Sequence, residues 1–369
     1  MKKINFSDVN PLSPKIISSI KKKIAKTINK EDFILGESVR NFEKDFSKIS
    51  NVKYSVSCAS GTDALTLTLM ALQLKQNDEV IVPGLTYIST GLAVILNNNK
   101  LVLADIDDQT GLIDINKIKT KITKNTKAII PVNLYGQKVD LVKLRRAVGR
   151  KISIIEDSAQ SHFALYENEK KPRQSKISIA ACYSFYPAKN LGAYGDGGLV
   201  STNSSTIYKR LLALRNLGSV KKYKHHLIGL NSRLDTIQAV VLKEKLDSIL
   251  DLNNKRRKIA NYYDKILAQI KQIKLTKTSK GSSRHLYVIR TIRRNELIKF
   301  LAKKGIYCII HYPYSLNKLE AFKNKVKKTK LENSEEWAKQ CVSLPLHPNL
   351  SIGDVRRVAV EIKNFFKSR

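Results

Sequence analysis

The sequence predicts an α/β fold in which a large domain with a mainly parallel central sheet is followed by a smaller C-terminal α+β domain. Short apolar runs alternate with helical segments over the first two thirds of the chain. This alternation is typical of a parallel sheet that is covered by helices on both faces. A long helical segment and a short strand–helix–strand pattern come next. We therefore expect a large domain over residues 1–245 and a small domain over residues 246–369.

The strands of the large domain are expected at short apolar runs that are rich in Val, Ile, Leu and Ala, the composition of buried strands. These runs occupy residues 53–60, 78–87, 100–106, 127–136, 151–159 and 177–187. A helix is predicted at residues 61–74, directly after the first strand. Ligands of such sheets bind at the carboxyl ends of the strands, so the residues that follow each run are candidates for a site.

The second part of the chain begins with a segment, residues 231–267, that is rich in helix-forming residues and almost free of helix breakers. We expect one long helix here that connects the two domains. Beyond it, the pattern predicts a strand at 285–292, a helix at 295–305 and a second strand at 306–313. These elements would form the small α+β domain.

The composition is strongly basic, with 67 Lys and Arg against 31 Asp and Glu among 369 residues, a formal net charge of +36. Such a charge is found in proteins that bind nucleic acids or anionic surfaces. However, the basic residues are spread over many segments, and no nucleic-acid-binding motif accompanies them. We therefore interpret the basic runs at 21–23 and 323–330 as solvated faces and expect no nucleic-acid partner. The positive field can still concentrate an anionic substrate.

The cysteines and the N-terminus bear on metal binding and location. The four cysteines, Cys58, Cys182, Cys308 and Cys341, lie far apart, without a CxxC pair or a histidine at metal-ligand spacing, so we expect no disulfide framework and no metal site. The first 15 residues lack the apolar core of a signal peptide, and no run of 18 apolar residues occurs. We expect a cytoplasmic protein without a membrane partner.

Two strand ends carry candidate chemistry. Asp157 follows the apolar residues of the run at 151–159, at a strand end where a carboxylate would point into the ligand crevice, although an acid there can equally be a surface residue or a helix cap. Lys189 follows the next apolar run, among aromatic and proline residues and before several glycines. Desolvation there would lower the pKa of its amine and make it a nucleophile toward a carbonyl. Taken alone, Lys189 would more often be an exposed loop lysine.

A third motif lies between the first strand and the first helix, where Ser60, Gly61 and Thr62 stand in "SGTDAL". The N–H groups at a helix N-terminus bind phosphate, although Ser or Thr before a helix is often only a cap. A phosphate cradle, a strand-end carboxylate and a lysine in a turn, in this order, match pyridoxal phosphate. That cofactor has a phosphate to anchor, a pyridine nitrogen to pair with an acid and an aldehyde to link to a lysine.

At these motifs the chain resembles the DegT-type sugar-nucleotide aminotransferases, which are fold type I pyridoxal-phosphate enzymes. The resemblance covers essentially the whole chain. The matching blocks lie at residues 33–46, 60–65, 78–90, 131–137, 155–162, 184–198, 229–239 and 310–313.

The resemblance implies a role for each matching cofactor residue. Lys189 would bind the cofactor covalently and later move a proton, and Asp157 would pair with the pyridine nitrogen. Gln160 would lie by the phenolic oxygen, with Ala159 and Tyr87 on the two faces of the ring; Tyr87 can also be read as a half-buried strand tyrosine. The phosphate would be held by Gly61, Thr62, Ser184 and, from a second subunit, Asn231. This implies a homodimer with shared active sites.

The implied reaction is transamination, in which glutamate donates an amino group to a nucleotide-linked keto sugar. The blocks are most similar to those of the subgroup acting at C3 of dTDP-linked 3-keto-6-deoxyhexoses, while C4 aminotransferases share most of them. The candidate substrate contacts are His226, Arg233, His311 and Tyr312. Arg233 suits a diphosphate, and His311 and Tyr312 can equally be strand-end packing residues.

A second interpretation is a non-catalytic basic binding or regulatory protein built on the same scaffold. The chain retains Lys189, Asp157 and the "SGT" cradle, which favours the enzyme.

The chain also departs from the family pattern at three places. Asn133 stands where histidine is usual, Gly91 stands where an aromatic residue or histidine is common, and the turn within 164–178 lacks the usual glycines. The last two are expected near the substrate pocket.

Overall fold

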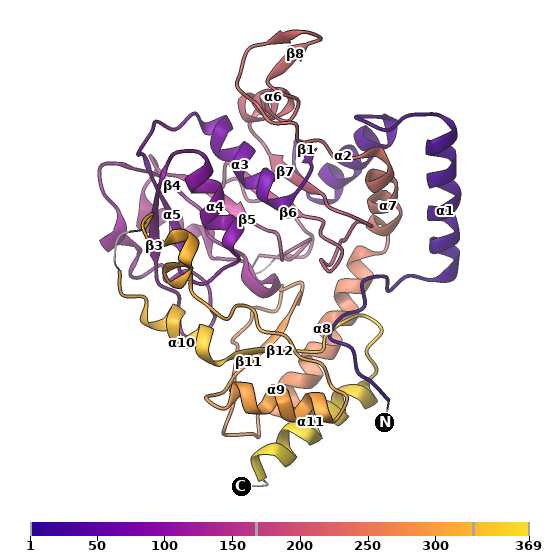
Figure 1. The fold of residues 1–369 in the computed structure, drawn as a ribbon, viewed down its shortest axis with the longest axis vertical. Helices are drawn as coiled ribbons and strands as arrows, with labels where there is room; N and C mark the ends of the chain where they lie inside the picture. Colours follow the sequence, from indigo (N-terminus) through magenta and orange to yellow (C-terminus); the bar gives the residue numbers. More distant parts are fainter. Residues whose placement is uncertain (1, 167–168, 327–328, 368–369) are drawn as a thin grey trace.

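The computed structural model describes residues 2–166, 169–326 and 329–367. Lys327 and Lys328 of the basic run at 323–330, and two residues of the turn at 164–178, lie outside this range. The run at 21–23 is exposed on a helix, as expected for a solvated face. Figure 1 shows a sheet-containing part with helix α1 at its side and a smaller part built around β11, α9 and α11.

Within the described residues, a central sheet of seven strands has the order β1-β7-β6-β5-β4-β2-β3. The neighbours from β6 to β3 run parallel, whereas β7 is antiparallel to both β6 and β1. The mainly parallel sheet is thereby confirmed. The strand bounds are β1 Tyr54–Cys58, β2 Glu79–Pro83, β3 Lys100–Ala104, β4 Thr126–Ile129, β5 Ser153–Asp157, β6 Ala180–Ser184 and β7 Gly198–Thr202.

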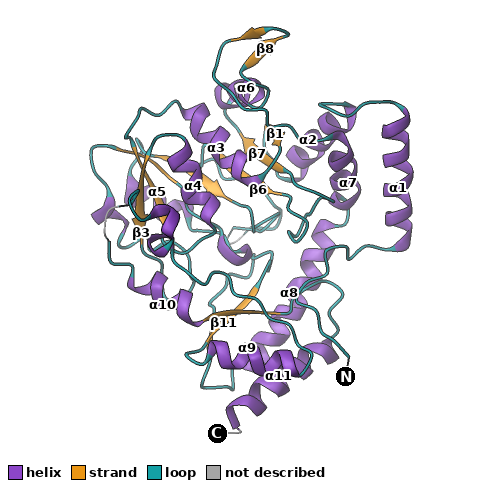
Figure 2. Ribbon diagram, in the orientation of Figure 1, coloured by secondary structure: helices purple, strands orange, loops and turns teal. Residues whose placement is uncertain are grey.

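Helices cover both faces of this sheet, because alternate residues of each strand belong to different cores (Figure 2). In β6, Ala180 and Cys182 pack with α3 (Gly61–Leu72), α4 (Ile88–Leu96) and α6 (Ser205–Leu214). Ala181 and Tyr183, on the other face, pack with α2 (Glu37–Ile49) and α7 (Thr236–Leu246). On that side the adjoining strands β4 and β5 are covered by α5 (Leu141–Val148). α1 (Pro14–Asn29) packs on α7.

The single long helix predicted at 231–267 is wrong, because the segment forms two helices, α7 and α8 (Ile249–Leu267), that are separated at Asp247 and Ser248. No glycine or proline marks this break. α7 buries Leu242 and Leu246 in the core of the large domain, whereas the second half of α8 packs in the core of the small domain. The two halves of the segment therefore serve different cores, and tertiary packing sets the break.

The small domain contains an antiparallel sheet of β10 (Lys274–Leu275), β11 (Tyr287–Arg290) and β12 (Cys341–Leu344). α9 (Arg294–Lys303) packs against this sheet, and α11 (Ile352–Lys367) packs against α9 and α8. α10 (Glu332–Gln340) directly precedes β12. Ile4 from the N-terminus enters the same core.

The strand predicted at 306–313 is wrong. Within the described residues, this segment forms isolated bridges, Ile306 with Ile4 and Ile309 with Ser343. The segment changes partner along its length, from the N-terminal residues to β12, so its backbone hydrogen bonds do not build a ladder with one strand.

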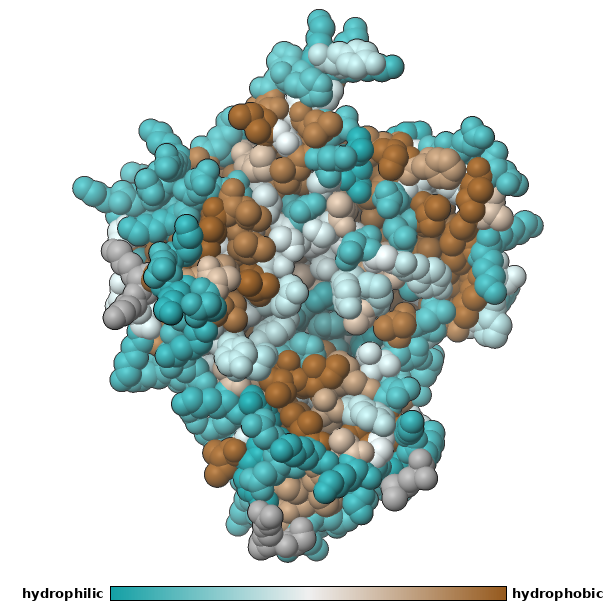
Figure 3. Space-filling view, viewed as in Figure 1, coloured by the Kyte–Doolittle hydropathy of each residue, from teal (hydrophilic) through white to brown (hydrophobic). Residues whose placement is uncertain are grey.

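The surface carries hydrophilic side chains over most of the face seen in Figure 3, with apolar side chains gathered in separate patches. No helix of the described residues has the length and apolar character needed to cross a membrane. The described part of the chain also contains no cluster of His, Cys, Asp and Glu that could hold a metal ion. Each of the four cysteines is a free thiol.

Candidate functional site

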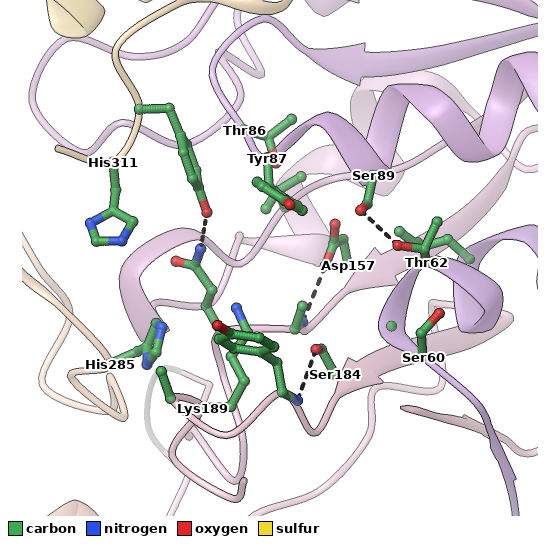
Figure 4. A pocket seen from close by; sticks show the side chains of 18 of the residues that line it. Ser60, Thr62, Thr86, Tyr87, Ser89, Asp157, Ser184, Lys189, His285 and His311 are labelled. Atoms are coloured by element: carbon green, nitrogen blue, oxygen red, sulfur yellow. Dashed lines mark hydrogen bonds between the residues drawn. The ribbon is translucent and has the colours of Figure 1, made fainter. Parts of the chain in front are cut away.

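The carboxyl ends of β5 and β6 face a cavity of about 480 Å³. The start of α3, the loop after β2 and three residues from the C-terminal domain, His285, His311 and Tyr312, complete its wall. Figure 4 shows His285 and Lys189 on one side of the view, Asp157 near its centre, and Ser60, Thr62 and Ser89 on the other side. The predicted site residues that line the cavity are Gly61, Thr62, Tyr87, Asp157, Ala159, Gln160, Ser184, Lys189, His311 and Tyr312.

Lys189 lies in a tight turn after β6. The Lys189 N–H donates to the Tyr186 carbonyl at 2.8 Å, and the Ala193 N–H donates to the Phe185 carbonyl at 2.8 Å. A Cβ atom at Gly192 would lie 2.3 Å from the carbonyl oxygen of Pro187, so the close return of the chain requires glycine. Removal from bulk water lowers the pKa of the Lys189 amine to about 8, although the Asp157 carboxylate opposes this shift. A substantial fraction of this amine is neutral near physiological pH and can act as a nucleophile.

Asp157, the last residue of β5, is buried beside Lys189. Its two carboxylate oxygens accept hydrogen bonds from the Thr90 hydroxyl at 2.8 Å and from the Ala159 N–H at 3.1 Å. Burial raises the pKa of the carboxyl group, while these two hydrogen bonds and the Lys189 charge act in the opposite direction. Since a buried carboxylate is stabilised by a nearby cation, Asp157 is suited to pair with a protonated ring nitrogen.

The N-terminus of α3 forms the opposite wall. Ser60 caps the helix by accepting a hydrogen bond from the Asp63 N–H at 3.0 Å. A Cβ atom at Gly61 would lie 2.5 Å from the Cβ atom of Ser184, so the helix start and the end of β6 approach as closely as glycine permits. The hydroxyls of Thr62 and Ser89 lie 2.7 Å apart. Helix N–H groups without acceptors, together with several hydroxyls, are the donors that bind a phosphate.

Gln160 connects the cavity to Tyr312 and, through Tyr135, to His311. Its Nε2 donates to the Tyr312 hydroxyl at 2.8 Å, and its Oε1 accepts from the Tyr135 N–H at 2.8 Å. The Tyr135 hydroxyl in turn donates to the His311 carbonyl at 2.6 Å. The Tyr87 ring lies 5.7 Å from the Tyr312 ring, between their centroids, and Tyr87 is 57% exposed. Tyr87 and Tyr312 thus form an aromatic wall at the cavity's open side.

Three of the predicted site residues do not line this cavity: His226, Asn231 and Arg233. His226 directly follows the hairpin of β8 (Ser219–Lys221) and β9 (Lys224–His225), which projects from the molecule at the top of Figure 1. His226 and Asn231 are exposed, and Arg233 donates to the Asn216 side chain at 2.9 Å. Within one chain, therefore, the structure does not bring them to Lys189.

Several lining or supporting residues were not predicted. Ser89 and Thr90 lie at the start of α4, two and three residues after Tyr87. In the sequence, only their position within the matching block at 78–90 points to the site. His285 precedes β11 and is buried against the cavity. Nothing in its local sequence marks it, because the contact with the Lys189 turn is tertiary.

The two departures that lie within the described residues have structural explanations. Asn133 is buried and donates to Glu156 and Ser158, each at 3.0 Å, while its side-chain oxygen accepts from the Val139 N–H. Gly91 is not among the residues that line the cavity, although it directly follows Thr90, which bonds Asp157. A Cβ atom there would lie 2.8 Å from the Phe322 ring, so close packing requires the glycine.

Comparison with known proteins gives a match to the family model described as the DegT/DnrJ/EryC1/StrS aminotransferase family over residues 14–363. The chain is 36% identical over 363 residues to UDP-2-acetamido-2-deoxy-3-oxo-D-glucuronate aminotransferase of Pseudomonas aeruginosa, covering 98% of this chain and 100% of that protein. It is 37% identical over 364 residues to dTDP-3-amino-3,6-dideoxy-alpha-D-galactopyranose transaminase of Aneurinibacillus thermoaerophilus, covering 98% and 99%.

Among solved structures, the fold is similar to that of S. venezuelae DesV in complex with a ketimine intermediate. The TM-score is 0.94 at 34% sequence identity, and the match covers 99% of each chain. The similarity therefore extends over nearly the whole length of both chains.

Proposed function

Because this chain belongs to the DegT/DnrJ/EryC1/StrS aminotransferase family, we propose that it transfers an amino group from glutamate to C3 of a nucleotide-linked keto-6-deoxy sugar. It is a pyridoxal-phosphate-dependent sugar-nucleotide aminotransferase. The finer proposal concerns the sugar, the position of the transferred nitrogen and the amino donor. The product would supply amino-sugar or surface-polysaccharide biosynthesis, in the cytoplasm, where sugar nucleotides are made.

The observation that carries this proposal is one cavity with three kinds of group at its walls. The lysine with a lowered pKa fits the aldehyde of the cofactor, and the buried carboxylate fits its ring nitrogen. The helix N-terminus, where Gly61 lets α3 approach β6 closely, fits the phosphate. The residues that would hold the phosphate are Gly61, Thr62 and Ser184. Ala159, Gln160 and Tyr87 would contact the ring.

When bound, pyridoxal phosphate supplies an electron sink and carries the amino group between the two substrates. The chain's own residues supply the rest. We propose that Lys189 Nζ holds the cofactor and moves a proton to and from the reacting substrate carbon. Asp157 keeps the ring nitrogen protonated, because its carboxylate, although buried, is stabilised by the Thr90 and Ala159 hydrogen bonds. His311 and Tyr312 orient the sugar at the open side.

The sugar is proposed to be a dTDP-linked 3-keto-6-deoxyhexose. The names of the two similar curated proteins both place the chemistry at C3, one on a UDP sugar and one on a dTDP sugar. The alternative is transfer to C4 of a UDP-, GDP- or dTDP-linked 4-keto sugar. The high positive charge of the chain favours anionic nucleotide sugars of every kind, and so it does not discriminate among them.

We also propose that the protein is a homodimer in which each chain completes the active site of the other. Asn231, Arg233 and His226 lie outside the cavity of their own chain, on or near a projecting hairpin with exposed apolar residues such as Val220 and Tyr223. Such a surface is suited to a partner subunit. The boundary between the two domains is proposed at residues 245/246, close to the break between α7 and α8.

The cofactor and amino-donor steps can be tested by absorption spectroscopy. The purified protein with pyridoxal phosphate should show a visible absorption band that disappears when glutamate is added. Lys189→Ala should abolish the original band, and Lys189→Arg, which retains the charge, should abolish it as well. A protein that is colourless and indifferent to added pyridoxal phosphate would contradict the proposed function.

The sugar can be tested with a panel of nucleotide-linked keto sugars in the presence of glutamate. Mass spectrometry of the products should detect the amino sugar, and NMR should place the nitrogen at C3. The dTDP-linked 3-keto-6-deoxyhexose should react with the highest kcat/KM. A preference for a 4-keto sugar would replace the C3 proposal by the C4 alternative.

A further inference from the structure

A chain of side-chain hydrogen bonds runs beneath the Lys189 turn to His285. Asn253 of α8 donates from its Nδ2 to the His162 carbonyl at 2.9 Å. Asn190, the residue after Lys189, donates from its Nδ2 to the Asn253 Oδ1 at 2.8 Å and to the Ser283 carbonyl at 3.0 Å. The Asn190 Oδ1 then lies 3.0 Å from the His285 Nδ1.

The direction of every hydrogen bond in this chain is determined by the two backbone carbonyls, because a carbonyl oxygen can only accept. Asn253 must turn its amide nitrogen to one carbonyl, and Asn190 must turn its amide nitrogen to the other. The Asn190 oxygen therefore faces His285 and accepts from its Nδ1. A neutral imidazole has one N–H, so the Nε2 atom of His285 carries a lone pair.

The His285 ring borders the same cavity as Lys189 (Figure 4). Among the residues that the structure describes, none forms a hydrogen bond with the His285 Nε2. This atom is also not one of the fully buried polar atoms that lack a partner, so it remains accessible from the cavity. The charged and titratable groups that act on His285 are Lys189, Arg256, His311 and His162. Together with burial, they lower the pKa of the imidazole well below its usual value, so the ring stays neutral near physiological pH.

We propose that His285 is a positioning residue for Lys189: its Nε2 lone pair accepts a hydrogen bond from the Lys189 ammonium, directly or through one water, while that amine holds its proton. The proposal rests on the proposed function, because it concerns the amine that binds the cofactor and moves the proton. It also assigns Asn190 and Asn253 the task of keeping the imidazole in the accepting tautomer.

The chemical consequence is a less depressed pKa for Lys189. A hydrogen bond to the ammonium stabilises the charged form and acts, like Asp157, against the desolvation that lowers the pKa. Loss of the acceptor should therefore lower the pKa of Lys189 further and make the neutral amine available at a lower pH. The fraction of Lys189 that is protonated at neutral pH in the cofactor-free protein should fall accordingly.

A matched pair of variants separates this role from packing. His285→Asn places an amide nitrogen where Nδ1 stands, which preserves a donor to Asn190 but leaves nothing at the position of Nε2. His285→Gln is long enough to place its carbonyl oxygen near the position of Nε2. His285→Phe keeps the ring and removes both nitrogens. Thermal unfolding and circular dichroism establish that each variant is folded.

The measurement is the rate at which pyridoxal phosphate attaches to the cofactor-free protein, followed by absorbance as a function of pH. Since the neutral amine is the nucleophile, the rate rises through the pKa of Lys189. In His285→Asn and His285→Phe the midpoint should lie about one pH unit below that of the wild type, the size expected for a hydrogen bond to a charged group. In His285→Gln it should remain close to the wild-type value.

The outcomes are distinguishable. Equal midpoints in the wild type, His285→Asn and His285→Phe would overturn the proposal and leave the proposed function intact. Equal shifts in His285→Asn and His285→Gln would also overturn it, because they would trace the effect to packing. A wild-type protein that does not attach pyridoxal phosphate would instead contradict the proposed function. If His285→Phe does not fold, the Asn and Gln pair decides.

Discussion

At the scale of single residues, the site depends on two groups that burial destabilises in their charged forms. Burial raises the pKa of Asp157 and lowers that of Lys189, so each is shifted toward neutrality and each is partly restored by the other. Opposite charges of buried groups in one cavity are the usual arrangement by which enzymes tune an acid and an amine. The residues that support the pair can therefore be tested through pH dependence.

Thr90 is the first such residue, because its hydroxyl donates to the Asp157 carboxylate at 2.8 Å. This bond lowers the pKa of Asp157 against the effect of burial, so Thr90→Val should raise that pKa further. The ionised carboxylate is needed to pair with the ring nitrogen. The acidic limb of the kcat–pH profile should therefore move to higher pH, by about one unit.

Thr86→Val is the matched control for this prediction. The Thr86 hydroxyl lies 3.0 Å from that of Thr90 and does not contact Asp157 in the described structure. Its loss should shift the acidic limb by much less. Identical profiles for the wild type and Thr90→Val would show that Thr90 does not tune Asp157.

Burial of the Lys189 ammonium should lower the free energy of unfolding of the cofactor-free protein. Its folded pKa is about 8 against the usual 10.5, so between these values the folded state binds fewer protons than the unfolded state, and stability rises with pH. Lys189→Met removes a desolvated ammonium. At pH 7 it should increase the free energy of unfolding by on the order of 3 kcal/mol.

The measurement is thermal unfolding of the cofactor-free proteins at pH 7 and above pH 10. The advantage of Lys189→Met should shrink as the pH rises through the interval from about 8 to 10.5. The exposed Lys255 serves as the control, since Lys255→Met should leave the unfolding temperature nearly unchanged. A variant at position 189 that is less stable at pH 7 would contradict the predicted burial cost.

At the scale of elements, the site is formed where the start of α3 meets the end of β6. The parallel strands bring their carboxyl ends to one edge, and α3 directs its N-terminus toward that edge. Gly61 allows the two elements to touch, because any side chain there would collide with Ser184. Phosphate affinity is thus tied to the distance between one helix and one strand.

Gly61→Ala tests this closeness. Its Cβ atom would lie 2.5 Å from that of Ser184, so α3 must shift, and the affinity for pyridoxal phosphate should fall by roughly tenfold or more. Titration of the cofactor-free protein, followed by absorbance, measures the loss. Gly353→Ala in α11 is the control, because its Cβ atom would meet its nearest atom at 3.7 Å and should leave the affinity unchanged. Equal affinities for both variants would refute the requirement.

At the scale of the whole molecule, the proposed dimer explains why some predicted residues lie away from the cavity of their own chain. Asn231 is exposed and is not among the lining residues, although it belongs to a block that matches the family. The proposal places it in the cavity of a second copy. If the active sites are shared, two different inactive variants should complement each other, whereas separate sites would not allow this.

Mixing two inactive variants, Lys189→Ala and Asn231→Ala, should restore activity after the subunits exchange. A mixed dimer has one site with both defects and one site with neither, so random exchange should recover up to about a quarter of wild-type activity. Size-exclusion chromatography with light scattering should give the mass of a dimer for each variant. A mixture that stays inactive although the subunits exchange would contradict the shared site.

The sequence by itself determined the parts that depend on local pattern. The alternation of apolar runs and helices predicted the mainly parallel sheet, and the motifs around Gly61, Asp157 and Lys189 predicted residues that the structure brings into one cavity. Strand ends and helix starts carry these residues, so the order of elements along the chain sufficed to bring them to one edge.

Only the tertiary structure decided the rest, because the relevant contacts join segments that are distant in sequence. The break between α7 and α8 has no glycine or proline, and it arises where one segment serves two cores. The segment 306–313 changes partner between the N-terminal residues and β12, so its apolar pattern does not become a strand. His285 reaches the cavity from 96 residues beyond Lys189 through a hydrogen bond to Asn190. No local signal encodes the tautomer that this bond selects.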